Sequence, residues 1–278
     1  MSLSASTRFA GVIGAPVRHS LSPVIHNAWI AAAGLDGAYL AFEPAADSFD
    51  VAVGGLNAAG CVGLNVTLPF KERALALADA ASERARAAGA ANLLVFEAGG
   101  IRADNTDGLG LLAALAGAGF SPAGAEVVVL GAGGAARGAV LALLGAGARR
   151  VVVANRSLDR AQALARADPR VQPIAWAEAA AALAQADAVI NATSLGMEGQ
   201  PPLELDLSAA RPAMVAMDMV YRPLRTGLLA QARARGHPVA DGLSMLIAQA
   251  EPSFEALFGR PVPAGAEVRG LCEARLTP

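Results

Sequence analysis

Short apolar segments alternate with longer amphipathic segments along nearly the whole chain of 278 residues. The short apolar runs are typical of buried strands, and the longer segments have the periodicity of helices that cover such strands. Regular alternation of the two predicts β-α units, and therefore mainly parallel sheets with helices on their faces. The expected fold class is α/β.

The first part of the chain is predicted to hold three strands, three helices and a hairpin. The hairpin is expected because Ala98-Gly99-Gly100 is a turn signal between apolar runs at 93–97 and 101–105. The strands are expected at 9–14, 38–43 and 62–67, and the helices near 22–33, 48–59 and 71–88.

A second series of elements forms a complete parallel sheet by itself. Its strands are expected at 126–130, 150–155, 171–174, 187–193 and 214–220, with helical stretches between them. A further helix is expected at 243–259, with an internal Pro252.

Glycine and proline at 117–124 interrupt any continuous helix between the two series, so we predict two domains. The first is an N-terminal α/β domain of residues 1–108, joined by the C-terminal helices at 241–278. The second, residues 109–240, has a doubly wound parallel sheet.

Composition and charge narrow the class of protein. Hydrophobic residues make up 54% of the chain, but many are alanines, and no run reaches the roughly 18 uninterrupted apolar residues of a membrane span. The net charge of -2 gives no electrostatic reason to expect nucleic acid or an anionic membrane as a partner. The N-terminus lacks a signal-peptide pattern, and Cys61 and Cys272 lie far apart without a metal-binding spacing. We therefore expect a cytoplasmic protein with a small-molecule ligand.

A glycine-rich turn follows the predicted strand at 126–130. The run from Gly131 to Arg137, GAGGAAR, matches G-x-G-x-x-A between a strand and a helix. Gly131 permits the tight turn, Gly133 lets the backbone approach a pyrophosphate, and Ala136 lets the helix pack closely on the sheet. The pattern predicts a Rossmann-type dinucleotide site, and a glycine-rich turn without a ligand is the alternative.

The end of the next strand indicates which dinucleotide is bound. An NAD-preferring site usually carries an acidic residue there, whereas this chain has Asn155 and Arg156, with Arg160 one helical turn further on. Guanidinium groups suit planar, bidentate contact with phosphate. The sequence therefore favours NADP, and the alternative is that both arginines are merely solvated at the start of a helix.

Polar side chains gather where elements of the first domain end. Ser20 and Ser22 flank a helix start, and a helix cap explains Ser22 without a ligand, whereas Ser20 has no such role. Asn65 and Thr67 alternate out of a strand toward one side, and Lys71 follows on the next loop or helix start.

Two carboxylates occur in the run Asp104-Asn105-Thr106-Asp107 directly before a helix, where capping is again the alternative explanation. Hydroxyls, amides, one lysine and one aspartate together fit a hydroxylated small acid, because hydroxyl groups need paired donors and acceptors while a cation binds the acid group.

Eight segments resemble the motifs of the shikimate dehydrogenase family, in the family's order. They are GAPVRHSLSPVIHN, NVTLPFK, GAAN…DNTDG, GAGGAAR, ANRS, NATSLGM, DMVYRPLRTGLL and DGLSMLIAQA, and the match extends from about residue 11 to 255. The resemblance implies reversible reduction of the 3-keto group of 3-dehydroshikimate by NADPH, a step toward chorismate and the aromatic amino acids. It also implies that the domain of residues 1–108 is the substrate-binding and catalytic domain and that residues 109–240 form the NADP-binding Rossmann domain. A monomer or a homodimer is expected.

The resemblance also implies roles for single residues. Lys71 and Asp107 fall on the catalytic lysine and aspartate, and Ser20 and Ser22 fall on the serines that bind the substrate carboxylate. Other substrate contacts would be Asn65, Thr67, Asn92, Tyr221 and Gln249. The phosphate loop would be Gly131, Gly133, Gly134, Ala135 and Arg137, and the adenosine end Asn155, Arg156 and Arg160. Leu93 departs from the family, which commonly has threonine there, so a hydroxyl near the substrate is absent.

Two alternatives remain at this stage. The first is a quinate/shikimate dehydrogenase that uses NAD, against which Arg156 argues. The second is a catalytically silent, NADP-binding regulatory protein, against which the retention of both Lys71 and Asp107 argues. His19, His26 and His237 lack the paired spacing of a metal site, so no metal is expected. His26 is expected to be packed and hydrogen-bonded inside the first domain.

Overall fold

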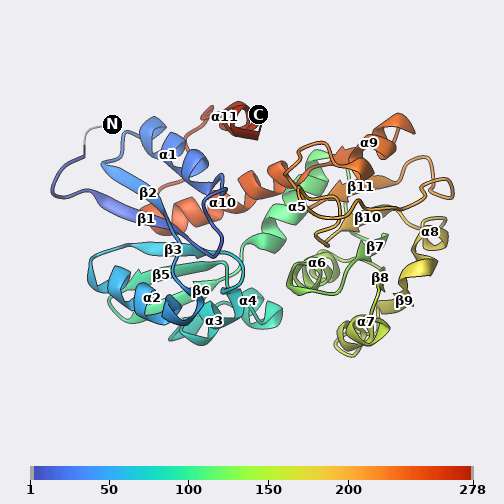
Figure 1. Cartoon of the computed structure of the whole chain (residues 1–278), viewed down its shortest axis with the longest axis horizontal. Helices are drawn as coiled ribbons and strands as arrows, with labels where there is room; N and C mark the ends of the chain where they lie inside the picture. The colour runs from blue at the N-terminus through green and yellow to red at the C-terminus, as the bar shows by residue number, and fades with distance from the viewer. Residues whose placement is uncertain (1–2, 277–278) are drawn as a thin grey trace. The chain divides into compact units, whose positions relative to one another are not determined.

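The computed structural model describes residues 3–276, and the chain separates into two compact units, most of whose helices and strands are labelled in Figure 1. Unit 1 comprises Met1–Thr106 and Gln249–Pro278, and unit 2 comprises Asp107–Ala248. Helix α10, Gly242–Phe258, carries the chain from unit 2 back into unit 1. The predicted domains divide after residues 108 and 240, whereas the compact units divide after 106 and 248.

Unit 1 is built on a six-stranded sheet of order β2-β1-β3-β5-β6-β4. Strands β1, β2 and β3 are parallel, as expected for β-α units, but the hairpin β5–β6 pairs antiparallel with β3 and makes the sheet mixed. The strands are β1 Arg8–Ile13, β2 Gly37–Phe42, β3 Gly63–Val66, β4 Ala80–Ala81, β5 Leu93–Glu97 and β6 Gly100–Asp104. The predicted hairpin is therefore confirmed.

Helices cover both faces of this sheet. In Figure 1, α2 and α3 lie on one side of it and α1 and α11 on the other. The helices of unit 1 are α1 Ser22–Ala32, α2 Phe49–Ala58, α3 Lys71–Ala76, α4 Glu83–Ala88, the second part of α10, and α11 Arg269–Leu276. Phe49 and Phe70 stack at 4.5 Å on the α2 side, and Trp29 meets Phe254 edge-on at 5.6 Å on the α1 side.

The prediction of a single helix at 71–88 is wrong. Helix α3 ends at Ala76, and strand β4 separates it from α4. The backbone N–H groups of Asp79 and Ser82 donate to β6, and the Ser82 hydroxyl accepts from the N–H of Ala85, which starts a new helix. The high alanine content of this segment hid the break.

His26 is packed as expected, but the expected hydrogen bonding is not complete. Its ring stacks on Tyr39 with 4.1 Å between centroids, and only 1% of the residue is exposed. Its Nδ1 atom is buried without a hydrogen-bond partner. Burial lowers the pKa of His26 to about 3, because a charged imidazolium would lose its hydration there.

This burial predicts a pH dependence of stability. The unfolded chain protonates His26 near pH 6.5, whereas the folded protein keeps it neutral down to about pH 3. Folding therefore excludes a proton in this window, and the free energy of unfolding is expected to fall by up to about 1.4 kcal/mol per pH unit as the pH drops from 6.5.

Urea denaturation between pH 7 and pH 4 measures this effect in the wild type and in His26→Phe. The free-energy difference is expected to move in favour of the variant as the pH falls, and two parallel profiles would contradict the prediction. His19→Phe removes one histidine from an exposed position and serves as the control.

Unit 2 contains a six-stranded, fully parallel sheet of order β12-β11-β10-β7-β8-β9. The chain starts in the middle at β7, proceeds outward through β8 and β9, and returns to β10 on the other side of β7. This order is the doubly wound arrangement, with its switch point between β7 and β10. The strands are β7 Glu126–Leu130, β8 Arg150–Asn155, β9 Val171–Ala175, β10 Ala188–Asn191, β11 Val215–Asp218 and β12 Val239–Ala240.

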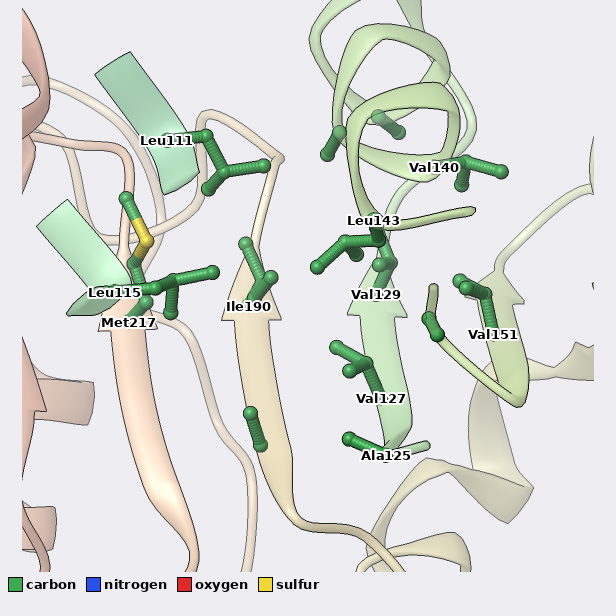
Figure 2. Packing of buried hydrophobic residues seen from close by; sticks show 14 of the residues in the cluster. Leu111, Leu115, Ala125, Val127, Val129, Val140, Leu143, Val151, Ile190 and Met217 are labelled. Carbon is green, nitrogen blue, oxygen red and sulfur yellow. The ribbon is translucent and has the colours of Figure 1, made fainter. Parts of the chain in front are cut away.

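Two hydrophobic layers enclose this sheet. Figure 2 shows Leu111 and Leu115 of α5 beside Ile190 and Met217, and Leu143 of α6 over Val129. The opposite layer contains buried residues of α8 and α9. The helices that belong wholly to unit 2 are α5 Asp107–Gly117, α6 Gly134–Gly145, α7 Leu158–Ala165, α8 Ala179–Ala182 and α9 Gly227–Ala234. No helix among residues 3–276 is long and apolar enough to cross a membrane.

Candidate active site and nucleotide-binding loop

The glycine-rich turn has a backbone that only glycine adopts without strain. Gly131 has a φ of 104°, and a Cβ atom there would lie 2.9 Å from the methyl carbon of Thr193 and 3.2 Å from the carbonyl oxygen of Ala192. Glycine is thus required both by conformation and by the close approach of a neighbouring segment.

The next two glycines leave a bare stretch of backbone. Gly133 and Gly134 are exposed, and a Cβ atom on either would meet no heavy atom within 4 Å. Helix α6 begins here, its first turn contains no acidic residue, and Ala136 is completely buried beneath it. Open backbone N–H groups at the positive end of a helix are suited to a diphosphate, so this turn fits a dinucleotide.

The turn that follows β10 is polar and lies directly beside Gly131, through Ala192 and Thr193. The Thr193 hydroxyl donates to Asn191 Oδ1 at 2.7 Å, and Asn191 Nδ2 donates to Asp218 Oδ1 at 2.9 Å. Asp218 is completely buried, which raises the pKa of its carboxyl, and its Oδ2 atom has no hydrogen-bond partner. Asp218 therefore fixes the turn next to the phosphate loop through Asn191.

The end of β8 presents the arginines that the sequence assigned to the adenosine side. The Asn155 amide donates to the carbonyl of Ser157 at 2.8 Å and closes the turn into α7. Arg156 and Arg160 are exposed, and within the described part of the chain neither makes an ion pair. Both guanidinium groups are available for an anion. Ala135 is exposed and Arg137 half-buried on the first turn of α6.

In unit 1, the two serines flank the start of α1, but the capping explanation for Ser22 is wrong. Ser22 is the first residue of the helix, Leu21 takes the capping position, and no side chain caps the helix. The backbone N–H of Ser22 instead donates to the Ser20 hydroxyl at 3.3 Å. The Ser22 hydroxyl therefore makes no capping hydrogen bond to the helix.

Lys71 is the first residue of α3, directly after the loop that follows β3. Its backbone carbonyl accepts from the N–H of Ala91 at 2.8 Å, which ties it to the segment that carries Asn92. The N–H of Thr67 donates to the carbonyl of Ile13 at the end of β1. Thr67 and Lys71 thus lie beside the carboxyl ends of β1 and β3, where open α/β sheets bind ligands.

The two carboxylates before α5 have different environments. Arg84 forms an ion pair with Asp104, and the Ser82 hydroxyl donates to the same carboxylate at 2.6 Å. Burial alone raises the pKa of Asp104, but the hydrogen bonds from Arg84 and Ser82 hold it below the ordinary value. Asp104 is thus a structural anion, whereas Asp107 is half-buried at the first position of α5.

A buried hydrogen-bond network joins three of the predicted substrate residues. Asn65 Nδ2 donates to the Asn92 backbone carbonyl at 3.1 Å, and Asn92 Nδ2 donates to Gln249 Oε1 at 3.1 Å. Gln249 comes from α10, more than 150 positions away in the sequence, so the network is a product of the fold. Tyr221 belongs to unit 2 and is half-buried in the loop after β11.

Sequence reasoning missed five residues that support these positions. They are Tyr39, Thr106 and Ser253 in unit 1, and Asn191 and Asp218 in unit 2. Asn191 and Asp218 had a signal, since they begin the segments NATSLGM and DMVY, and Thr106 lies within DNTDG. Tyr39 and Ser253 had none, because Tyr39 lies in an apolar strand and Ser253 belongs to none of the recognised motifs.

A doubly wound parallel sheet with a bare glycine-rich turn at its switch point defines unit 2 as a dinucleotide-binding domain. Protein-family models agree: the shikimate dehydrogenase substrate-binding domain matches residues 12–94, and shikimate/quinate 5-dehydrogenase matches residues 114–197. An NADP-dependent shikimate dehydrogenase of Caulobacter vibrioides is 54% identical over 266 residues, covering 94% of this chain and 93% of its own.

Solved structures give the same answer. Shikimate dehydrogenase of Aquifex aeolicus has a TM-score of 0.89 at 35% identity and full coverage of both chains. The Thermus thermophilus enzyme, solved with NADP(H) and shikimate, has a TM-score of 0.86 at 35% identity and covers 97% of this chain and 98% of its own. The chain belongs to the shikimate dehydrogenase family. It is therefore an oxidoreductase, and NADP is its cofactor.

Proposed function

We propose that this chain catalyses the reversible, NADPH-dependent reduction of 3-dehydroshikimate to shikimate, with Lys71 and Asp107 as the residues that handle the proton. The observation that carries this proposal is the position of Lys71, which opens α3 just beyond β3 and is tied through its carbonyl to the segment of Asn92. The relatives named shikimate dehydrogenase (NADP(+)) support the reaction.

The nucleotide is held by residues of unit 2. Backbone N–H groups at Gly133 and Gly134 bind the diphosphate, and Arg156 with Arg160 binds the 2′-phosphate. When bound, NADPH supplies the hydride. Thr193 and the turn beneath it keep the loop in shape, as the close contact at Gly131 requires.

The proton chemistry falls to Lys71. During reduction the substrate carbonyl oxygen gains negative charge, and an ammonium group hydrogen-bonded to that oxygen stabilises the charge and delivers the proton. Asp107 is the second residue of the proposed pair, since a carboxylate favours the charged form of a lysine. The hydroxyls of Ser20 and Ser22 bind the substrate carboxylate.

Arg156 is expected to set the preference for NADP over NAD. Arg156→Ala should raise KM for NADPH about 10- to 100-fold and leave KM for NADH unchanged, since only NADPH carries the 2′-phosphate. Arg166→Ala removes the same charge from the other end of α7, where Arg166 is also exposed, and is the control. Initial rates at fixed ionic strength measure both, and equal losses with the two cofactors would contradict the role.

Incubation of the protein with 3-dehydroshikimate and NADPH tests the proposed reaction. Shikimate should appear in a one-to-one ratio with NADPH consumed, as followed by absorbance and by chromatography. Absence of turnover despite tight NADPH binding would instead favour a silent nucleotide-binding protein. The expectations of a monomer or homodimer, of a cytoplasmic location and of no nucleic-acid partner remain predictions.

A further inference from the structure

We propose that a hollow at the amino ends of β7, β10 and β11 binds a zwitterion with an apolar side chain, such as an apolar α-amino acid. The hollow has a volume of about 390 Å³, and the residues that line it all belong to unit 2. It is a second small-molecule site, separate from the nucleotide loop, and it does not depend on the proposed reaction.

The hollow lies at the edge of the sheet opposite to the nucleotide loop. Ala125, Asp187 and Met214 line it, and they directly precede β7, β10 and β11. Gly131 follows the other end of β7, and Figure 2 shows Ala125 at the start of that strand and Val129 near its arrowhead. A strand of five residues spans about 16 Å, so a ligand in the hollow lies outside the nucleotide site.

An ion pair presents both signs of charge at the hollow. Arg211 Nη1 donates to Asp187 Oδ1 at 2.7 Å, and the two side chains are 54% and 33% exposed. Asp187 Oδ2 accepts from the backbone N–H of Glu126 at 2.9 Å. Each carboxylate oxygen keeps a second lone pair, and within residues 3–276 the other N–H groups of Arg211 make no hydrogen bond. The pair can therefore accept from a cation and donate to an anion.

The balance of charge in the hollow favours a zwitterion over a simple ion. Asp187 and Arg211 are the charged residues among those that line it, and their charges cancel. A lone carboxylate would gain Arg211 but also meet Asp187, and a lone ammonium group would have the reverse problem. A zwitterion carries an ammonium group and a carboxylate on one carbon atom, so it can pair with both residues at once.

The remaining lining is mostly apolar. Phe120 is half-buried and Ala213 is exposed, while Ala186 and Met214 are buried and close the hollow beneath them. The accessible part of the Phe120 ring can pack against an apolar or aromatic side chain. Ser121 is exposed, and within the described part of the chain its hydroxyl makes no hydrogen bond, so it can donate to the carboxylate of the ligand.

Titration of the ¹⁵N-labelled protein with L-phenylalanine tests the proposal. The ¹H–¹⁵N signals of Ala125, Asp187 and Met214 should shift in a saturable manner, and those of Gly131 and Gly133 should not. 3-Phenylpropanoate lacks the ammonium group, and 2-phenylethylamine lacks the carboxylate. Each should therefore bind about 10-fold more weakly than L-phenylalanine, because it loses one charge-assisted hydrogen bond.

Variants of the hollow assign the binding to its own side chains. Arg211→Gln and Asp187→Asn each remove one charge, and each should raise the Kd for L-phenylalanine about 10-fold. Ala213→Trp keeps the ion pair but fills the hollow, so it should abolish binding even if one of the charge variants fails to fold. Arg235→Gln is the matched control, because Arg235 is a cation of unit 2 outside the hollow, 3.8 Å from Asp206, and its loss should leave the Kd unchanged.

Three results would overturn the proposal. The first is the absence of saturable shifts at Ala125, Asp187 and Met214. The second is equal affinity for L-phenylalanine and either of its singly charged analogues, which would mean that no zwitterion is selected. The third is an unchanged Kd in Arg211→Gln, Asp187→Asn and Ala213→Trp, which would place the ligand elsewhere. None of these readouts requires turnover, so they are independent of the proposed reaction.

Discussion

Replacement of Lys71 by alanine is expected to lower kcat by about 100- to 10,000-fold, with a much smaller change in KM. The proposed role of the ammonium group is exercised in the transition state, where charge develops on the substrate oxygen, and much less in the bound ground state. Steady-state kinetics with saturating NADP measures both constants.

Arg73→Ala is the matched control for this experiment. Arg73 lies on the same helix and forms an ion pair with Asp50 at 2.7 Å on the protein surface. Its removal takes away one cation from α3 and should leave kcat unchanged. Comparable turnover in Lys71→Ala and the wild type would refute the catalytic role.

Gly131→Ala is expected to damage both stability and cofactor binding. At a φ of 104° an alanine is strained by roughly 1–2 kcal/mol, and its Cβ atom would also press against Thr193 and the Ala192 carbonyl. The turn must shift to relieve the contact, so we expect a lower free energy of unfolding and at least a 10-fold higher Kd for NADPH.

Two other glycines of the same segment separate these effects. Gly133→Ala meets no neighbouring atom and should leave stability almost unchanged while weakening NADPH binding, because the added methyl group covers bare backbone. Gly138→Ala, inside α6 with free space around it, should stabilise the helix by up to about 1 kcal/mol and leave binding unchanged. If Gly133→Ala bound NADPH as the wild type does, the loop would not hold the diphosphate.

Strong local patterns made most of the fold predictable. The valine-rich run at 126–130 followed by Gly131 predicted strand, turn and helix, and the turn at residues 98–100 predicted the hairpin. The prediction failed where local signals were weak. The two-residue strands β4 and β12 are too short to show periodicity, and they form because neighbouring strands supply hydrogen bonds.

Only those residues of the candidate site that lie within recognisable sequence motifs could be predicted. Residue types and spacing alone left Asp104 and Asp107 as one cluster, and only the family resemblance singled out Asp107. The structure adds the ion pair with Arg84 that gives Asp104 its own structural role. Ser253 lies in none of the recognised motifs, although its hydroxyl accepts a hydrogen bond from Asn65, which lies 188 residues away in the sequence. Such contacts depend on tertiary packing, which spacing along the chain does not encode.

Leu93 is the residue at which this chain departs from its family, and the structure gives it a packed position. It is 1% exposed and pairs with Asn65 across the antiparallel strands β5 and β3. The hydroxyls that contact Asn65 come from Tyr39 on β2 and Ser253 on α10. Leu93 thus contributes to the core beside the substrate residues.

The most direct measurement of the central claim is a set of four initial rates, with shikimate or quinate as substrate and NADP or NAD as cofactor. Because we propose that Arg156 binds the 2′-phosphate, and the chain belongs to the shikimate dehydrogenase family, kcat/KM should be highest for shikimate with NADP by at least 10-fold over each other combination. A clear preference for quinate with NAD would contradict it.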